Sequence, residues 1–235
     1  MKRAVRETDR VYSVLSEDRG KLELFATGSR KILSKLAGDM EHTGVLDVFV
    51  VRGRSFDRLA GAAPLETFGA VRDSYERQYA VLSMTSFLDR AVRPGERDGA
   101  LFRLLQEYLA AVADASAQAL ADGRLVLAMQ WKVFARLGFR PDLERCVRCR
   151  VSVPGAQAAF TIRHGGVVCV DCKIRGVALD ATPLTADART VLGLLLDAPL
   201  ADAHRLFLGP SLRVATHALT SAWSLTHLEL PAVTA

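Results

Sequence analysis

All four cysteines of the 235-residue chain lie in one short stretch, as two pairs with two residues inside each pair. The pairs are Cys146 with Cys149, and Cys169 with Cys172. A spacing of two residues lets a tight turn point both sulfurs at one place, and two such turns complete the tetrahedral shell that suits zinc. Because four thiolates leave no coordination position open for a substrate, we expect a structural Zn²⁺ ion rather than a catalytic one.

Two other interpretations of the cysteines are disulfide bonds and a redox-active pair. Disulfides require an oxidising compartment, and the opening residues, MKRAVRETDR, lead into no apolar stretch of the kind that a secretory signal has. A redox-active Cys-x-x-Cys motif normally stands alone, whereas this chain holds two. His164 lies between the pairs and is an alternative to one cysteine as a ligand, although the four thiols have the better spacing.

Basic residues surround the cysteines. Between residues 140 and 176 there are 7 Lys and Arg residues against 3 Asp and Glu residues. Positive charge favours the thiolate form and offsets the negative charge of a zinc ion with four thiolate ligands. A second contact with DNA is an equally good explanation for the arginines. The basic residues nearest the thiols are Arg145, Arg148, Arg150 and Lys173.

Signatures of catalysis are scarce in the rest of the chain. The sequence contains no phosphate-binding glycine loop, no dinucleotide-binding motif, no His-Glu-x-x-His motif and no Gly-x-Ser-x-Gly motif. The five histidines are scattered, and no pair of carboxylates stands apart from the other charged residues. We therefore expect a protein that is not an enzyme.

Residues 1–68 have the apolar pattern of β-strands. Two apolar runs flank a turn at Asp18-Arg19-Gly20, and two more flank residues 52–56. Such short strands would leave exposed edges in an open sheet, and closure into a barrel removes these edges. We expect about four or five strands that form either a small barrel or a strongly twisted sheet.

From about residue 70 the apolar residues take helical spacing. The predicted helices cover residues 71–92, 99–115, 120–138, 184–198 and 211–228. In the first of them the predicted apolar positions are Val71, Tyr75, Tyr79, Leu82 and Phe87. Trp131 and Met129 are expected in the core, and Thr185 is expected to cap the helix that follows it. Residues 158–162 and 165–170 are predicted to form short strands around the cysteines.

The net charge of +5 is concentrated in the first segment and around the cysteines, and residues 1–60 alone hold 12 basic and 9 acidic residues. Positive charge attracts polyanions, because binding releases their counterions. A solvated arginine-rich surface is the other explanation for this excess. No apolar run approaches the roughly 18 residues that are needed to span a bilayer.

The basic residues of the predicted barrel loops are the candidates for contact with phosphate groups, which carry no base identity. The candidates are Arg19 and Lys21 at the first turn, Arg30, Lys31 and Lys35 between the hairpins, and Arg52 and Arg54 at the second turn. Among the aromatic residues, Phe56 is the candidate for stacking on a base. Tyr12, Phe25 and Phe49 are expected in the core.

The order of these parts resembles the RecO family of bacterial recombination mediators over nearly the whole chain. The most specific stretch is Leu137-Gly138-Phe139 with Pro141, Leu143 and Cys146, followed by Gly165-Gly166 and the second cysteine pair. The loop from Gly28 to Gly38 resembles a glycine-bounded basic stretch of that family. Family members carry roughly one more strand before the residues equivalent to Glu7–Arg10. We therefore expect either that the protein starts upstream of Met1 or that its first barrel strand is shortened.

The resemblance implies an α+β multidomain fold. Its parts would be an oligonucleotide-binding (OB) fold barrel over residues 1–68, a helical domain over residues 69–142 and 177–235, and an inserted four-cysteine zinc module over residues 143–176. The resemblance also implies a cytoplasmic, nucleoid-associated protein that binds single- and double-stranded DNA and anneals complementary strands. Such a protein works with RecR to load RecA onto DNA that is coated by the single-strand-binding protein.

Two functions of other classes remain open on the residues alone. One is a zinc-ribbon factor that binds RNA or acts in transcription, and the other is an interaction scaffold whose basic residues serve solubility or acidic protein partners. A comparison of binding to single-stranded DNA, duplex DNA and RNA separates the first from a recombination mediator. The scaffold predicts no retention of DNA at low salt.

Overall fold

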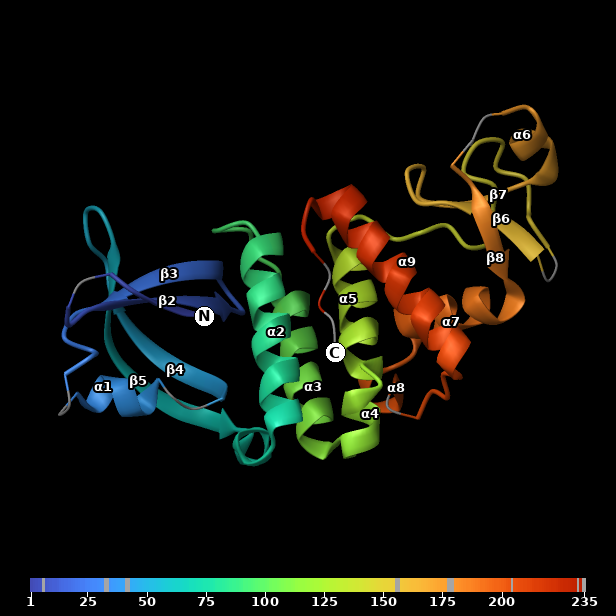
Figure 1. The fold of residues 1–235 in the computed structure, drawn as a ribbon. Coiled ribbons are helices and arrows are strands. Elements are labelled where there is room, and N and C mark those ends of the chain that lie inside the picture. Colours follow the sequence, from blue (N-terminus) through green and yellow to red (C-terminus); the bar gives the residue numbers. More distant parts are fainter. Residues whose placement is uncertain are drawn as a thin grey trace. The chain divides into compact units, whose positions relative to one another are not determined.

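The computed structural model describes residues 1–5, 7–31, 34–40, 43–154, 157–176, 180–203, 205–231 and 233, and the side chains of residues 35, 37 and 157 also lie outside this description. The chain divides into two compact units, residues 1–115 and residues 116–235. Strands and helices occur in both units, so the expected α+β class is confirmed (Figure 1). Within the described part of the chain, no helix has both the length and the apolar character needed to cross a membrane.

The division at residue 115 groups two of the predicted helices with the N-terminal sheet. The finer domain bounds stay a prediction: residues 1–68, residues 69–142 with 177–235, and residues 143–176.

The N-terminal unit opens with a five-stranded sheet in the order β1-β2-β3-β5-β4. The strands are β1 (Lys2–Ala4), β2 (Arg10–Ser16), β3 (Gly20–Ala26), β4 (Gly44–Val51) and β5 (Asp57–Thr67). Neighbouring strands are antiparallel except β3 and β5, which pair in parallel. Both predicted hairpins are present, with turns at residues 17–19 and 52–56. The strand-rich, OB-like sheet that we expected is confirmed.

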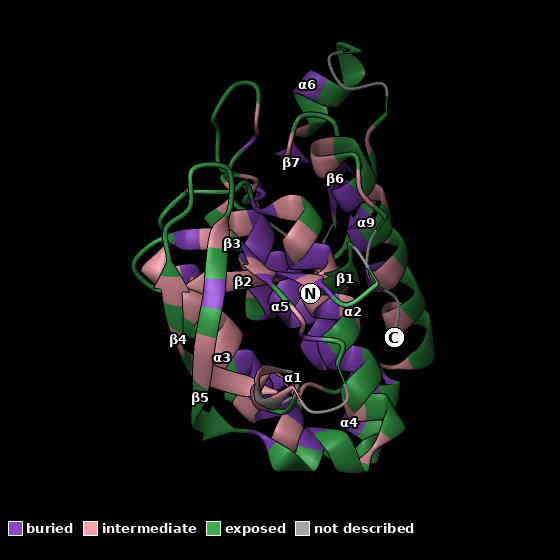
Figure 2. Cartoon of the chain, turned by 90° about the vertical axis from the view of Figure 1, so that its left-hand side faces the viewer, coloured by how far each residue is buried: buried purple, intermediate pink, exposed green. Residues whose placement is uncertain are grey.

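One side of this sheet holds a small apolar core. Tyr12, Leu24, Ala26 and Leu59 are buried there, and partly buried side chains from β4 pack against them. Helix α1 (Lys35–Asp39) lies between β3 and β4 in sequence, and its Leu36 joins the same cluster. Alternate residues of β2, β3 and β4 face this core, as the period of two along a strand requires. Leu59 is the one buried residue of β5 (Figure 2).

A short 3₁₀ helix, η1 (Gly69–Asp73), leads into α2 (Tyr75–Ala91), and α3 (Gly99–Asp114) follows. Ser74 caps α2 by accepting a hydrogen bond from the N–H of Arg77. Asp98 caps α3 in the same way, through the N–H groups of the next turn. The two predicted helices of this unit are therefore present.

The predicted apolar face of the first helix was wrong at three of its five positions. Tyr75, Tyr79 and Leu82 are exposed, with 76%, 39% and 60% of their surface open to solvent. The buried residues of α2 are Ala80, Val81, Met84, Phe87 and Leu88. The prediction began the helix at Val71, which belongs to the preceding 3₁₀ turn, so it joined residues from opposite sides of α2 into one face.

The C-terminal unit is built around α5 (Arg124–Arg136), whose Met129 and Trp131 are fully buried, as predicted. Trp131 donates a hydrogen bond from Nε1 to Oγ1 of Thr220 (2.9 Å) and packs on Trp223 at 5.4 Å between ring centroids. Gly138 ends the helical segment in a left-handed conformation that glycine adopts easily (φ 89°). The other helices of the bundle are α4 (Ala117–Ala121), α7 (Ala186–Asp197), α8 (Leu200–Ala203) and α9 (Pro210–Leu228).

A second, three-stranded sheet in the order β7-β6-β8 lies in the same unit. The predicted strands correspond to β6 (Gln157–Thr161) and β7 (Gly166–Val168), and α6 (Val170–Ile174) follows them. Strand β8 (Thr182–Thr185), which pairs with β6, was not predicted. This strand is short, contains Pro183 and stands at the sheet edge, where proline is tolerated. Thr185 then caps α7, as expected, by accepting from the N–H of Ala188 (3.2 Å).

Candidate metal centre and nucleic-acid interface

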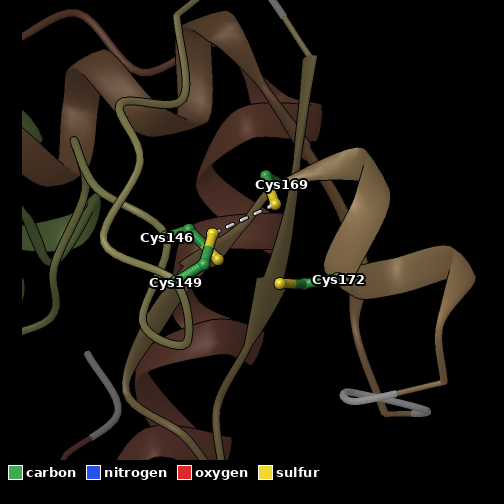
Figure 3. A group of neighbouring side chains, drawn as sticks. All are labelled: Cys146, Cys149, Cys169 and Cys172. Atoms are coloured by element: carbon green, nitrogen blue, oxygen red, sulfur yellow. Dashed lines mark hydrogen bonds between the residues drawn. The ribbon is translucent and has the colours of Figure 1, made fainter.

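The four cysteines converge on one point of the C-terminal unit (Figure 3). Their sulfur atoms all lie within 4.8 Å of one another, and those of Cys149 and Cys169 are 3.6 Å apart. A tetrahedron with Zn–S bonds of about 2.3 Å has edges of about 3.8 Å. The sulfur positions therefore fit a four-coordinate metal ion with little movement.

The first cysteine pair is held by a tight turn of backbone. The N–H of Cys146 donates to the carbonyl of Val151 (2.8 Å), and the N–H of Arg150 donates to the carbonyl of Cys146 (2.9 Å). Arg150 takes a left-handed conformation (φ 63°), which folds the chain back after Cys149. The second pair brackets the start of α6, where Lys173 N–H donates to the carbonyl of Cys169 (3.0 Å).

Asp142 joins the first turn to the β6–β7 hairpin. Its carboxylate accepts from the N–H groups of Glu144 and Arg145, and its other oxygen lies 2.9 Å from Nη1 of Arg150. Its backbone bonds to the hairpin, because Val167 N–H donates to the Asp142 carbonyl (2.9 Å). A Cβ at Gly166 would come within 2.3 Å of that carbonyl oxygen, so only glycine fits this approach.

The thiols differ in acidity, for reasons that lie in their hydrogen bonds. Burial works to raise the pKa of Cys146, but backbone N–H groups of the two turns donate to its sulfur and lower this pKa to about 6. A hydrogen bond with Cys169, together with burial, raises the pKa of Cys172 to about 12. Four thiolates at one point repel one another, and a divalent cation removes that repulsion. The donor set therefore suits a soft divalent metal such as zinc.

His164 and the basic residues that flank the cysteines lie around this cluster. His164 does not belong to the cluster of possible metal ligands found among the described residues. Its backbone N–H donates to Oγ1 of Thr161 (3.3 Å), and its ring is exposed in the β6–β7 turn. The four flanking basic residues, Arg145, Arg148, Arg150 and Lys173, are all exposed, and Arg150 also pairs with Asp142.

Four of the seven predicted DNA-contact residues lie at one end of the N-terminal sheet. This is the end where β3 and β4 finish and β5 begins, and it carries the β4–β5 loop that projects beyond the strands in Figure 1. Arg30 N–H donates to the Thr8 carbonyl (2.9 Å), so the segment after β3 lies beside the β1–β2 loop at this end. The exposed basic residues gathered here are Arg30, Lys31, Arg52 and Arg54.

The remaining three candidates behave differently. Arg19 is exposed in the β2–β3 turn, at the opposite end of the strands, and lies 3.7 Å from the carboxylate of Asp18. The side chain of Lys21 is only 13% exposed, because its ammonium contacts Asp89 of α2 (3.1 Å). It also donates to the carbonyl of Val92 (3.3 Å). The side chain of Lys35 lies outside the described residues.

Of the aromatic residues, Tyr12 is buried in the sheet core as expected, but Phe49 is 63% exposed and the prediction that placed it in the core was wrong. Phe56 is 68% exposed in the β4–β5 loop, and its ring stacks on Phe25 with centroids 6.3 Å apart. Arg58 is a further exposed cation here, opposite Phe25 in the sheet register. From Asp47 onwards exposed and half-buried residues alternate along β4, and the charged Asp47, two residues before Phe49, was the sequence signal for the exposed face.

Two family models match the chain in succession. The model described as "Recombination protein O N terminal" matches residues 1–68, and "Recombination protein O C terminal" matches residues 72–234.

Curated relatives agree with this match. The DNA repair protein RecO of Rubrobacter xylanophilus is 30% identical over 232 residues, covering 97% of this chain and 92% of that protein. The DNA repair protein RecO of Myxococcus xanthus is 30% identical over 223 residues, covering 94% and 86%. That of Desulforamulus reducens is 29% identical over 170 residues, covering 72% of this chain but only 64% of the relative. The chain belongs to the RecO family of DNA repair proteins.

Proposed function

We propose that this protein binds single- and double-stranded DNA without sequence preference and helps complementary strands to anneal. The observation that carries the proposal is the group of exposed cations on the β4–β5 loop and the segment after β3. In OB-folds the loop between the fourth and fifth strands is one of the places where oligonucleotides bind. Guanidinium and ammonium groups there would hold phosphate oxygens, which are the same for every sequence.

Annealing requires no bond to be made or broken in this proposal. Two strands repel one another through their phosphates, and a cationic surface that holds both screens that repulsion. Arg52 and Arg54 stand on a loop whose described residues offer them no ion pair, so their charge is available to a ligand. The proposal extends, through the family, to RecR and the single-strand-binding protein as partners and to the loading of RecA.

We further propose that the four cysteines hold one structural zinc ion, which would fix the two cysteine turns and the β6–β7 hairpin. With four thiolate ligands the ion has no position for a substrate, so its contribution is to folding. Elemental analysis of the purified protein tests this, with one zinc per chain expected. The absence of zinc from protein that is nevertheless folded around residues 142–176 would contradict the proposal.

Replacement of Arg52 and Arg54 together by alanine tests the DNA surface. We expect weaker binding to single-stranded and duplex DNA, and a salt dependence whose slope for single strands falls by about 1.4, since each phosphate contact contributes about 0.7. A matched control is the double replacement of Arg93 and Arg97, two exposed arginines of the α2–α3 loop. Gly95 of that loop bonds to Lys21, at the other end of the strands.

The outcomes separate the candidate functions. An unchanged salt slope in the Arg52 and Arg54 variant would place the DNA elsewhere. Equal effects of the control pair would mean that net charge alone governs binding. Preference for RNA over both forms of DNA would favour the alternative of an RNA-binding zinc-ribbon factor, and no retention of any nucleic acid at low salt would favour an interaction scaffold.

A further inference from the structure

The outer face of β4 carries large apolar side chains that do not pack in the core of the sheet. Phe49 and Val51 point away from the core and are 63% and 56% exposed, whereas the alternating residues Val48 and Val50 pack against it. Burying a phenylalanine is worth about 1.5–3 kcal/mol, so leaving one on a surface forgoes that stabilisation. An exposed aromatic residue beside a cationic loop is a feature of surfaces that bind unpaired bases.

The backbone beneath Phe49 is arranged to leave its ring accessible. Gly61 lies opposite Phe49 in the register of β4 and β5. A Cβ at Gly61 would be 3.5 Å from Cδ2 of the Phe49 ring, so the ring lies over the glycine backbone. Because glycine has no side chain, Gly61 leaves this side of the Phe49 ring uncovered.

A second aromatic group lies on the same side of the sheet. Arg58 of β5 is in register with both Phe25 of β3 and Val51 of β4, so these three side chains share a face. Phe25 supports the ring of Phe56, at 6.3 Å and with 30° between the ring planes. Since neighbouring strands are about 4.8 Å apart, the aromatic positions on β3 and β4 are separated by on the order of 10 Å.

The charges around these rings favour nucleic acid over a protein as the ligand. Arg58 stands between the two aromatic positions, and Arg52 and Arg54 follow on the adjoining loop. Asp47 is the exposed acidic residue of this face of β4, and Asp57 accepts from the N–H of Gly53 (3.4 Å). A chain of phosphates with bases at regular intervals matches alternating cations and rings.

We propose that Phe49 and Phe56 form a stacking platform for unpaired bases, which makes this face selective for single-stranded over duplex DNA. This inference rests on the proposed DNA-binding function and adds to it the residues that set the strand preference. In a duplex the bases are already stacked and paired inside the helix, so only their phosphates could reach Arg52, Arg54 and Arg58. In a single strand the bases are free to stack on both rings.

The test uses the full-length protein and three probes of equal length: a thymine oligonucleotide, the corresponding abasic oligonucleotide and a duplex. The abasic strand keeps the phosphates and lacks the bases. We expect the unmodified protein to bind the thymine strand more tightly than the abasic one. Phe49→Ala and Phe56→Ala should each lower affinity for the thymine strand about tenfold, within the range measured for base stacking, and leave the abasic strand and the duplex unchanged.

Two further variants make the outcomes distinguishable. Tyr75→Ala, which removes another exposed aromatic ring of the same unit, should change binding to none of the probes. The Arg52 and Arg54 double variant should weaken all three, and its failure to do so would overturn the DNA surface itself. Equal losses on the thymine and abasic strands in the phenylalanine variants, or equal binding of these two strands by the unmodified protein, would overturn the stacking platform alone.

Discussion

Asp122 offers a direct measurement of how the C-terminal unit is held together. Its side chain is only 6% exposed, in the loop between α4 and α5, and it forms ion pairs with Arg124 and with Arg213 of α9, the latter at 2.6 Å. Gln118 also donates to it (3.0 Å). The carboxylate therefore links the start of α5 to α9, two helices that are far apart in the sequence.

Replacement of Asp122 by asparagine keeps the shape of the side chain and removes its charge. Breaking a buried ion pair costs about 3–5 kcal/mol and breaking an exposed one about 0–1 kcal/mol. The side chain of Arg124 is 13% exposed and that of Arg213 is 38% exposed, so the site lies between these limits. We expect the free energy of unfolding to fall by about 2 kcal/mol, a substantial part of the 5–15 kcal/mol that a domain usually has.

The pH dependence gives the same prediction a second readout. The hydrogen bond and charge of Arg124, assisted by Arg213, lower the pKa of Asp122 in the folded protein. A lowered pKa means that the stabilisation is complete above the unfolded value of about 3.9 and is lost as the pH falls through the folded value. The difference between the two proteins should therefore be constant near neutrality and shrink in acid below about pH 4.

Urea unfolding followed by tryptophan fluorescence is the appropriate assay, because both tryptophans, Trp131 and Trp223, lie in the core of this unit. The control is Asp197→Asn, which removes an exposed carboxylate paired with Arg140 at 2.9 Å. Its effect should stay below about 1 kcal/mol. Equal effects of the two substitutions, or a loss at Asp122 that persists unchanged at pH 3, would refute the reasoning from burial.

Three other expectations test the metal centre and the sheet. Cys146→Ser should abolish stoichiometric zinc binding, measured by elemental analysis, and a variant that retains one tightly bound zinc would contradict the four-cysteine site. Gly166→Ala should lower the melting temperature, because its Cβ would overlap the carbonyl of Asp142, and an unaltered melting curve would show that the segment at Asp142 can move away from β7 without cost. Lys21→Ala should lower the stability of the N-terminal unit more than Arg19→Ala does, since the Lys21 ammonium is largely buried against Asp89; urea titrations of both variants compare them.

Features that depend on local spacing were predictable from the sequence. The spacing of the paired cysteines predicted a cluster that could hold a metal ion, because each pair is closed by its own short turn. The four sulfur atoms do lie within 4.8 Å of one another. The two hairpins and the end of α5 shortly before Gly138 were predictable for the same reason, since glycine and turn residues act on their nearest neighbours.

Features that depend on what packs against an element were not predictable. Tyr75 and Tyr79 have the spacing of a buried helix face, yet α2 buries its other side against Tyr108 and neighbouring residues of α3. In the sequence Lys21 resembles an exposed cation beside a turn, and its contact with Asp89 depends on the packing of α2 against the sheet. Strand β8 is defined by its pairing with β6, which lies some twenty residues earlier in the chain.

Direct contacts connect the cysteine centre with the helical core of the C-terminal unit. Phe160 of β6 packs on Trp223 of α9 with centroids 5.8 Å apart, and Nε2 of His227 lies 2.9 Å from the carbonyl of Ile162. The same hairpin is tied to the first cysteine turn through Asp142. A metal ion that fixes the cysteine turns would thus also fix the strand on which Trp223 rests. The proposed DNA surface lies in the N-terminal unit, so the ion would not need to contact DNA. Its contribution would be to stabilise the fold of the helical core of the C-terminal unit.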